Sequence, residues 1–114
     1  MPLMTAVEAH IHGKVVQPDP IELRKGDGDH VLWDSDTDVT VHFLPKPGHN
    51  GTPFTRDSFK VGKGTKVDSG PIHDKAEVCK KCENQPAAPH YHYKYEILDA
   101  NGVVLADPEV IIRN

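Results

Sequence analysis

The segment His90–Ile97 alternates strictly between two kinds of side chain, and this alternation constrains the fold more than any other stretch of the chain. A β-strand turns successive side chains to opposite faces. The tyrosines and Ile97 therefore share one face, whereas the polar residues, beginning with His90 and His92, share the other. The pattern predicts a half-buried antiparallel strand with an aromatic core face and a polar outer face.

Alternation recurs in shorter segments along the rest of the chain. Val7–Val16 predicts one strand that turns Glu8, His10 and His12 to its outer face. Further strands are predicted at Ile21–Leu23, His30–Asp34, Val39–Leu44, Ser58–Val61, Thr65–Ser69, Val103–Leu105 and Glu109–Ile112. We expect the second and third of these to pair across the Asp-rich turn between them. Short strands separated by such turns favour an all-β, Greek-key β-sandwich that forms one domain over residues 1–114.

Residues 70–89 do not show this alternation and are predicted to form a long irregular insertion. The segment contains prolines and both cysteines of the chain, Cys79 and Cys82. Proline removes a backbone donor, which limits any helix here to about one turn. Irregular segments of this length are uncommon in compact domains and often carry function.

The composition excludes several classes of partner. The chain has 114 residues, a formal net charge of -4 and no basic stripe. Because binding to a phosphate backbone requires clustered Lys and Arg, we expect no nucleic-acid partner. No apolar run reaches the length of a membrane span, so we expect no membrane span either. The first residues lack the charged and apolar regions of a signal peptide; we expect a cytoplasmic protein, or a periplasmic or secreted one if a signal peptide has been removed.

Several segments also resemble a known family. The run Ile21–Gly26, followed by Val31–Trp33 and Val39–Phe43, is similar to the first half of a cupredoxin. Tyr93–Ile97 and Asp107–Ile112 are similar to the last strands of small cupredoxin-like proteins. The likeness extends over most of the chain and leaves the insertion unmatched. It implies a cupredoxin-like Greek-key β-sandwich.

The resemblance does not extend to the type 1 copper site of that family, which uses an early His and then Cys, His and usually Met around the last hairpin. When the matching strands are aligned, Val39 stands where the early His is expected and Ile97 where the Cys is expected. Residues 99–105 contain neither His nor Met. We therefore expect no type 1 copper and no electron transfer of the blue-copper kind.

The chain nevertheless carries a candidate metal site of another kind. Cys79 and Cys82 have the spacing of a chelating thiolate pair, and with His90 and His92 they read C-x2-C-x7-H-x-H. Four such ligands suit Zn²⁺ in a tetrahedral site or Cu(I) in a site of lower coordination. The alternative is a loop disulfide or a pair of free thiols beside solvated histidines.

A second candidate pair is formed by His10 and His12, which lie one pleat apart on the outer face of their predicted strand. If that strand neighboured His90–Ile97, four imidazoles would gather on one face, and imidazole suits Zn, Cu, Ni or Fe. The alternative is that both histidines are exposed side chains on a polar face.

The residues support two hypotheses for function, which belong to different classes. The first is a small non-catalytic metal-binding module that holds zinc or copper for storage, delivery, sensing or structural support. The second is a metal-free protein-interaction domain that binds a protein partner, or itself as a homodimer, through an edge strand or loop. An enzyme is disfavoured because the sequence contains no nucleophile elbow and no Gly-rich phosphate loop. The pattern His90-x-His92-x3-Glu96 matches a first cupin motif, but no later His supplies a second motif.

Overall fold

The computed structural model describes residues 6–44, 51–73, 76 and 92–113. These residues form strands joined by turns, with one 3₁₀ turn (η1, Lys25–Asp27) between two of the strands. The strands are β1 (Ala6–His12), β2 (Val15–Gln17), β3 (Ile21–Arg24), β4 (His30–Ser35), β5 (Val39–Phe43), β6 (Ser58–Val61), β7 (Lys66–Asp68), β8 (His92–Leu98), β9 (Val104–Ala106) and β10 (Glu109–Arg113). The predicted all-β class is confirmed.

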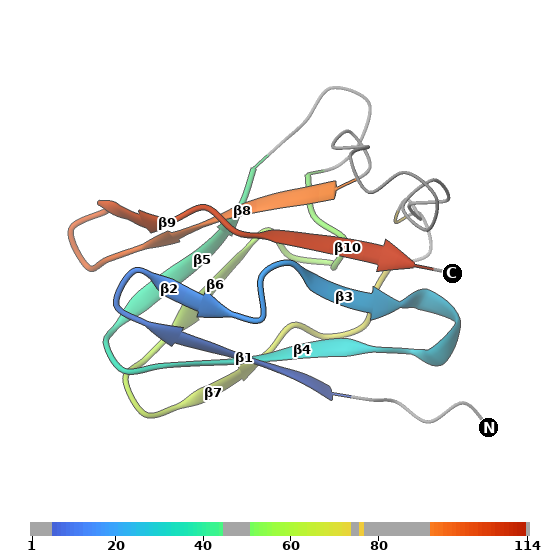
Figure 1. The fold of residues 1–114 in the computed structure, drawn as a ribbon, viewed down its shortest axis with the longest axis horizontal. Coiled ribbons are helices and arrows are strands. Elements are labelled where there is room, and N and C mark those ends of the chain that lie inside the picture. The colour runs from blue at the N-terminus through green and yellow to red at the C-terminus, as the bar shows by residue number, and fades with distance from the viewer. Residues whose placement is uncertain (1–5, 45–50, 74–75, 77–91, 114) are drawn as a thin grey trace.

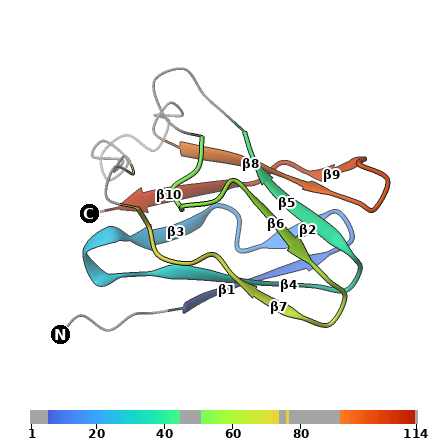
Figure 2. The ribbon, with the colours of Figure 1, turned by 180° about the vertical axis from the view of Figure 1, so that it is seen from behind.

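The strands form two sheets that lie face to face (Figures 1 and 2). The smaller sheet has the order β2-β1-β4-β7, and the larger has the order β3-β10-β8-β5-β6 with β9 paired to β8. Two pairs are parallel, β1 with β4 and β3 with β10. Because the chain passes repeatedly from one sheet to the other, neighbouring strands are mostly not consecutive in sequence. Each sheet buries one face against the other, which is the β-sandwich that the alternation predicted.

The alternation of β8 turns its aromatic face into the core as predicted. Tyr93, Tyr95 and Ile97 are at most 1 % exposed, whereas Lys94 and Glu96 between them are partly exposed. The strand is central in the larger sheet, because it pairs with β5 on one side and with β10 and β9 on the other. The Asn-Gly turn after β8 closes the β8–β9 hairpin, with Gly102 at a φ of 80° that favours glycine.

Trp33 of β4, in the smaller sheet, packs against rings that come from the larger sheet and from the loop before β6. Its ring centroid lies 5.1 Å from that of Phe59, 6.0 Å from Phe54, 6.1 Å from Tyr95 and 6.2 Å from Phe43. All five rings are at most 1 % exposed. Aromatic pairs at such distances stabilise a fold by about 0.5–1.5 kcal/mol each beyond the burial of their area. The aromatic cluster therefore joins the two sheets.

The polar atoms of this cluster, Trp33 Nε1 and Tyr95 Oη, are buried and have no hydrogen-bond partner within the described part of the chain. Burial raises the pKa of the Tyr95 hydroxyl well above its usual range, and the neighbouring Trp33 indole opposes part of that rise. Tyr95 is therefore protonated at neutral pH, and it contributes to the fold through the packing of its ring.

The single strand predicted for Val7–Val16 is wrong, because the chain reverses at Gly13 and Lys14. Gly13 has a φ of 58°, a conformation that favours glycine, and β1 and β2 pair as an antiparallel hairpin in which Ile11 lies opposite Val16. The reversal shifts the buried face by one residue. Val16 is 7 % exposed, whereas Val15, which a single alternating strand would turn to the same face as Ile11, is 53 % exposed.

The predicted pairing of His30–Asp34 with Val39–Leu44 is also wrong. The strands exist as β4 and β5, but β4 pairs with β1 and β7, whereas β5 pairs with β6 and β8. The turn between them carries the chain from one sheet to the other. Both strands have an apolar face, and placing them in opposite sheets lets both faces be buried in the same core. The turn is held by the Asp38 carboxylate, which accepts a hydrogen bond of 2.8 Å from the backbone N–H of Lys63.

The described part of the predicted insertion begins with a contact to the loop before β6. Ile72 forms an isolated β-bridge with Phe54, and the backbone N–H of His73 donates to the carbonyl of Pro53 at 3.0 Å. Ala76 is 5 % exposed, and its carbonyl accepts a hydrogen bond of 3.2 Å from Lys25 Nζ. The start of the insertion is therefore attached to the sandwich.

Candidate functional site

The first predicted metal site falls mostly outside the described residues. Cys79, Cys82 and His90 belong to residues 77–91, and of His92 only the backbone, which begins β8, is described. The joint ligation of one ion by these four residues therefore stays a prediction.

The second predicted pair, His10 and His12, lies on the outer face of β1, but β1 does not neighbour β8. The two strands belong to different sheets, and β1 lies between β2 and β4. The condition under which four imidazoles would gather on one face is therefore not met. Among the described residues, no group of three or more His, Cys, Asp or Glu side chains is placed to hold a metal ion.

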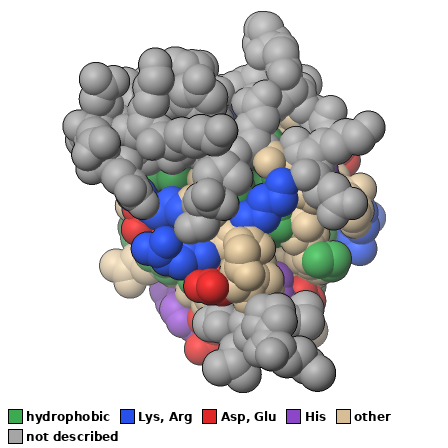
Figure 3. Space-filling model, turned by 90° about the vertical axis from the view of Figure 1, so that its right-hand side faces the viewer, with side chains coloured by type: hydrophobic (Ala, Val, Ile, Leu, Met, Phe, Trp, Pro, Cys, Tyr) green, Lys and Arg blue, Asp and Glu red, His purple; other side chains and the backbone are tan. Residues whose placement is uncertain are grey.

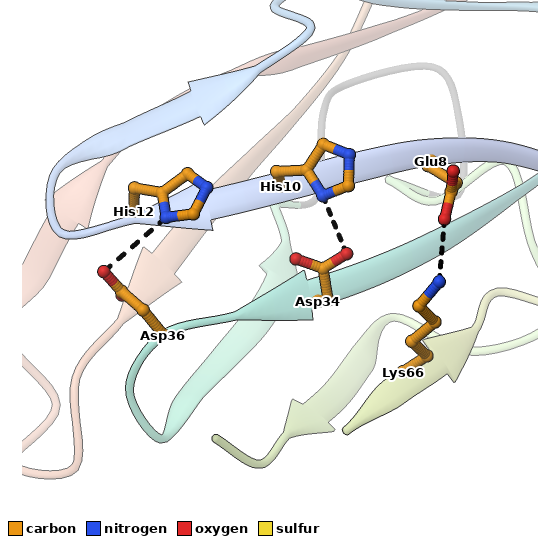
Figure 4. A network of polar contacts seen from close by, with 6 residues as sticks. All are labelled: Glu8, His10, His12, Asp34, Asp36 and Lys66. Atoms are coloured by element: carbon orange, nitrogen blue, oxygen red, sulfur yellow. Dashed lines mark hydrogen bonds and ion pairs between the residues drawn. The ribbon is translucent and has the colours of Figure 1, made fainter. Parts of the chain in front are cut away.

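Each histidine of this pair instead faces an aspartate (Figure 4). His10 Nδ1 lies 2.7 Å from Asp34 Oδ2, and His12 Nδ1 lies 3.6 Å from Asp36 Oδ2. Because an ionised carboxylate can only accept, the 2.7 Å contact places the proton of His10 on Nδ1. In the neutral imidazole, Nε2 of that ring is then left as the acceptor or ligand atom. The two rings are stacked, with centroids 6.4 Å apart and planes at 27°.

The parallel register of β1 and β4 produces this arrangement. His10 lies opposite Asp34 in the ladder, and both side chains point away from the core because their neighbours Ile11 and Trp33 are buried. Asp36 follows the end of β4 and lies near the β1–β2 turn, where its Oδ1 accepts a hydrogen bond of 3.3 Å from the backbone N–H of Gly13. The outward-facing residues of β1 therefore lie beside those of β4 and of the turn that follows it.

An ion pair extends the same row along the outer face. Lys66 Nζ of β7 donates to Glu8 Oε1 of β1 at 2.8 Å. The hydrogen bond and the charge of Lys66 lower the pKa of Glu8, and the same contact raises the pKa of Lys66. We call the six residues Glu8, His10, His12, Asp34, Asp36 and Lys66 the polar ladder; it crosses three strands of the smaller sheet (Figure 4).

A further histidine of this sheet, His30, is also paired with an aspartate. Its Nδ1 lies 2.9 Å from Asp68 Oδ1, and the same carboxylate oxygen accepts 2.8 Å from the backbone N–H of Gly70. Partial burial works to raise the pKa of Asp68, but the Gly70 hydrogen bond and the His30 contact outweigh it. The pKa of Asp68 is therefore lowered.

The Asp68 contacts predict how stability depends on pH. A carboxyl group whose pKa is lower in the folded state than its unfolded value of about 3.9 adds stability above about pH 4, and this contribution is lost as the pH falls through the folded pKa. We expect the free energy of unfolding, measured by urea titration between pH 5 and pH 3, to fall less steeply in Asp68→Asn than in the natural protein. Asp107→Asn, which changes an exposed carboxyl group, serves as the control. Equal slopes in Asp68→Asn and the natural protein would contradict the prediction.

The aspartate partners of His10 and His12 were missed by the sequence analysis. Asp34 and Asp36 belong to the Asp-rich segment that follows His30, and Asp-Ser-Asp repeats the spacing of His-Ile-His. That shared period was the available signal. Metal-binding histidines commonly donate the other ring N–H to a carboxylate, which fixes the orientation of the ring and raises its basicity. The geometry of His10 and Asp34 is of this kind.

Comparisons with known proteins name no family for this chain, since no protein-family model and no curated protein matches it. Within the described ranges, no helix is long and apolar enough to cross a membrane.

Proposed function

We propose that the protein is a small non-catalytic metal-binding module on a cupredoxin-like β-sandwich. Zinc or copper is bound through Cys79, Cys82, His90 and His92, with His10 and His12 as a second, weaker pair. The observation that carries metal binding in the described part of the chain is the imidazole of His10, whose Nδ1 is held by Asp34 at 2.7 Å and whose Nε2 is left for an ion. The role of the ion is storage, delivery, sensing or structural support.

The pairing of the strands supports the cupredoxin-like scaffold. The segments that carry the resemblance come from the two halves of the sequence; four of them lie in the larger sheet, whereas Val31–Trp33 lies in β4 of the smaller sheet. Ile21–Arg24 pairs with Glu109–Arg113, and Val39–Phe43 pairs with β8. Two separate resemblances that meet in one sheet favour a common scaffold over chance similarity of short apolar segments.

The described residues on either side of the insertion support an ion bound near its two ends. Cys79 follows the buried Ala76 by three residues, and His90 precedes His92 at the start of β8 by two. Since a chain spans at most about 3.6 Å per residue, both candidate ligands lie within short reach of fixed backbone. An ion bound in this way adds its binding free energy to the stability of the fold.

Elemental analysis of protein purified under reducing conditions without chelator tests the proposal. We expect about one zinc or copper ion per chain, which is lost in Cys79→Ser and retained in the double variant His10→Ala/His12→Ala. An ion present at 100 times its Kd stabilises the fold by about 2.7 kcal/mol, so chelation should also lower the Tm of the natural protein. An absence of bound metal, together with silent zinc and Cu(I) titrations, would contradict metal binding. If the ion were lost only from the His10→Ala/His12→Ala variant, the result would identify β1 as the location of the metal site.

A second candidate function, a protein-interaction domain without metal, is favoured by the exposed apolar side chains. Val15, Val103 and Val104 are 53 %, 56 % and 47 % exposed. They lie on or beside the short strands β2 and β9, each of which has a single hydrogen-bonded neighbour among the described strands. Open strand edges of this kind are sites at which a partner or a second copy can add.

A further inference from the structure

We propose that the polar ladder binds one Cu²⁺ ion through His10 and His12, and that the two ligands differ in role. His10 is the fixed ligand, and His12 leaves Asp36 to reach the ion. The inference rests on the proposed function, in which these histidines are the weaker metal-binding pair. It adds the identity of the ion and the movement that binding requires.

His10 is already held in the orientation of a metal ligand. Its Nδ1 lies 2.7 Å from Asp34 Oδ2, and its side chain is 44 % exposed, so solvent reaches the ring. A carboxylate on one ring nitrogen fixes the orientation of the imidazole and makes the other nitrogen a more basic ligand. His10 therefore offers Nε2 to an ion without having to move.

His12 is held less firmly than His10. Its Nδ1 lies 3.6 Å from Asp36 Oδ2, which is too long for a hydrogen bond, and its side chain is 63 % exposed. It is the last residue of β1, and Gly13 after it begins the turn to β2. Because an exposed contact of this kind contributes little, rotation of the His12 ring away from Asp36 costs little.

The two rings in their present positions cannot share one ion. Their centroids are 6.4 Å apart with planes at 27°, and Figure 4 shows both Nε2 atoms on the sides turned away from the aspartates. An imidazole nitrogen lies about 2.0–2.1 Å from a bound ion such as Zn²⁺, so two nitrogens on one ion are at most about 4.2 Å apart. Parallel rings held through Nδ1 keep their Nε2 atoms farther apart than this. The more weakly held ring, that of His12, must therefore rotate towards His10.

A site with two imidazoles suits Cu²⁺ better than Zn²⁺. Among the described residues, no third His, Cys, Asp or Glu side chain is placed to complete it. Structural zinc sites take four protein ligands, whereas Cu²⁺ binds nitrogen and oxygen ligands most tightly of the divalent first-row ions and accepts a tetragonal arrangement. Gln17 lies opposite His10 in the β1–β2 pair and is exposed, so it shares this face of the sheet. Its amide oxygen or water can supply the remaining ligands.

The charges around the two histidines do not by themselves select a cation. Lys66 is paired with Glu8 at 2.8 Å, and Lys14 and Lys63 belong to the turns that adjoin Asp36. Lys and Arg side chains also gather across the middle of the end of the sandwich that carries the chain termini (Figure 3). The ion is therefore recognised by the imidazole nitrogens and not by an excess of negative charge.

The test is a titration with Cu²⁺ in a background that lacks the main candidate site, so that the two sites are measured separately. This background is the full chain with the substitutions Cys79→Ser, Cys82→Ser, His90→Ala and His92→Ala. Electron paramagnetic resonance counts the bound nitrogens, because each one splits the copper signal. As a second measurement, His10→Ala is compared in the natural chain with His42→Ala, which removes a histidine of the larger sheet.

We expect one saturable Cu²⁺ site with two nitrogen ligands, which is lost in His10→Ala/His12→Ala. Asp34→Asn should weaken binding by about tenfold or more, as is usual when the carboxylate behind a ligand histidine is removed. Asp36→Asn should weaken it by less than about fivefold, because the loss of an exposed charge is small and His12 is released. Since each aspartate variant removes one charge, the difference between them reports the fixed role of His10.

Three outcomes would overturn the proposal. Unchanged Cu²⁺ binding in His10→Ala/His12→Ala would show that the ion binds elsewhere. A signal with one nitrogen would show that His12 does not reach the ion. Equal losses in Asp34→Asn and Asp36→Asn would show that the aspartates act only through their charge. None of these results changes the ion content of the natural chain or its loss in Cys79→Ser, so they are distinct from a failure of the proposed function.

Discussion

Trp33→Ala is expected to lower the free energy of unfolding by about 3–5 kcal/mol, the range for removal of a large buried aromatic side chain. Trp33 is fully buried, and its ring lies within 6.2 Å, centroid to centroid, of four other aromatic rings. The substitution leaves a cavity between the two sheets that none of these rings can fill without leaving its own contacts. Because the free energy of unfolding of natural domains is about 5–15 kcal/mol, the variant loses a large part of its total stability.

The measurement is urea unfolding followed by far-ultraviolet circular dichroism, since the variant lacks the single tryptophan of the chain. Val104→Ala is the matched control, because Val104 is 47 % exposed and should change stability by less than about 0.5 kcal/mol. Trp33→Phe keeps an aromatic ring and should lose less than Trp33→Ala. A loss below about 1 kcal/mol in Trp33→Ala would show that the aromatic cluster does not join the sheets as described.

The sequence predicted the strands better than it predicted their partners. The alternation of β8 correctly placed Tyr93, Tyr95 and Ile97 in the core, because a strand with one buried face must repeat every second residue. The same rule failed at Gly13. The chain reverses there, so the buried position in β2 is Val16 and not Val15, although the sequence up to Val15 keeps the alternating pattern. Alternation reports which face of a strand is buried, and a tight turn inside an alternating segment is invisible to it.

Pairing was harder to predict because local turn signals do not say whether a turn joins neighbours or crosses between sheets. The Asn-Gly turn after β8 carries a local hairpin signal and does join two neighbouring strands, β8 and β9. The Asp-rich turn after β4 looked similar, yet it carries the chain to the opposite sheet, where Val39 and Val41 are buried. What decides between the two is the burial of both apolar faces in one core, which depends on strands far apart in the sequence.

In the candidate site too, the sequence predicted which way side chains face but not which residues they contact. The sequence identified His10 and His12 as outward-facing residues, which is correct. It did not identify Asp34 and Asp36 as their partners, because that contact depends on the parallel register of β1 and β4. The pairing of His10 with Asp34 spans 24 residues, and no local pattern encodes it. Prediction of the polar ladder would have required the topology first.

The junction of β4 and β7 provides a second large expected effect, because Ser69 satisfies buried backbone groups there. Ser69 is 3 % exposed, its Oγ accepts a hydrogen bond of 2.9 Å from the N–H of Val31, and it donates one of 2.9 Å to the carbonyl of Gly70. The backbone N–H of Ser69 in turn donates to the carbonyl of Val31 at 2.8 Å. The side chain thus extends the β4–β7 ladder beyond the end of β7.

Ser69→Ala is therefore expected to lower the free energy of unfolding by about 1–3 kcal/mol, since it leaves the N–H of the fully buried Val31 without its partner. Urea unfolding measures the loss, and hydrogen exchange at the Val31 amide should accelerate more than exchange in β8, because the unpaired group lies in the smaller sheet. Ser58→Ala is the matched control: Ser58 is exposed on β6, and its side chain makes no hydrogen bond within the described residues. If both variants unfolded at the same urea concentration, Ser69 Oγ would contribute nothing measurable to the β4–β7 ladder, and the pairing of these strands would depend on their backbone hydrogen bonds.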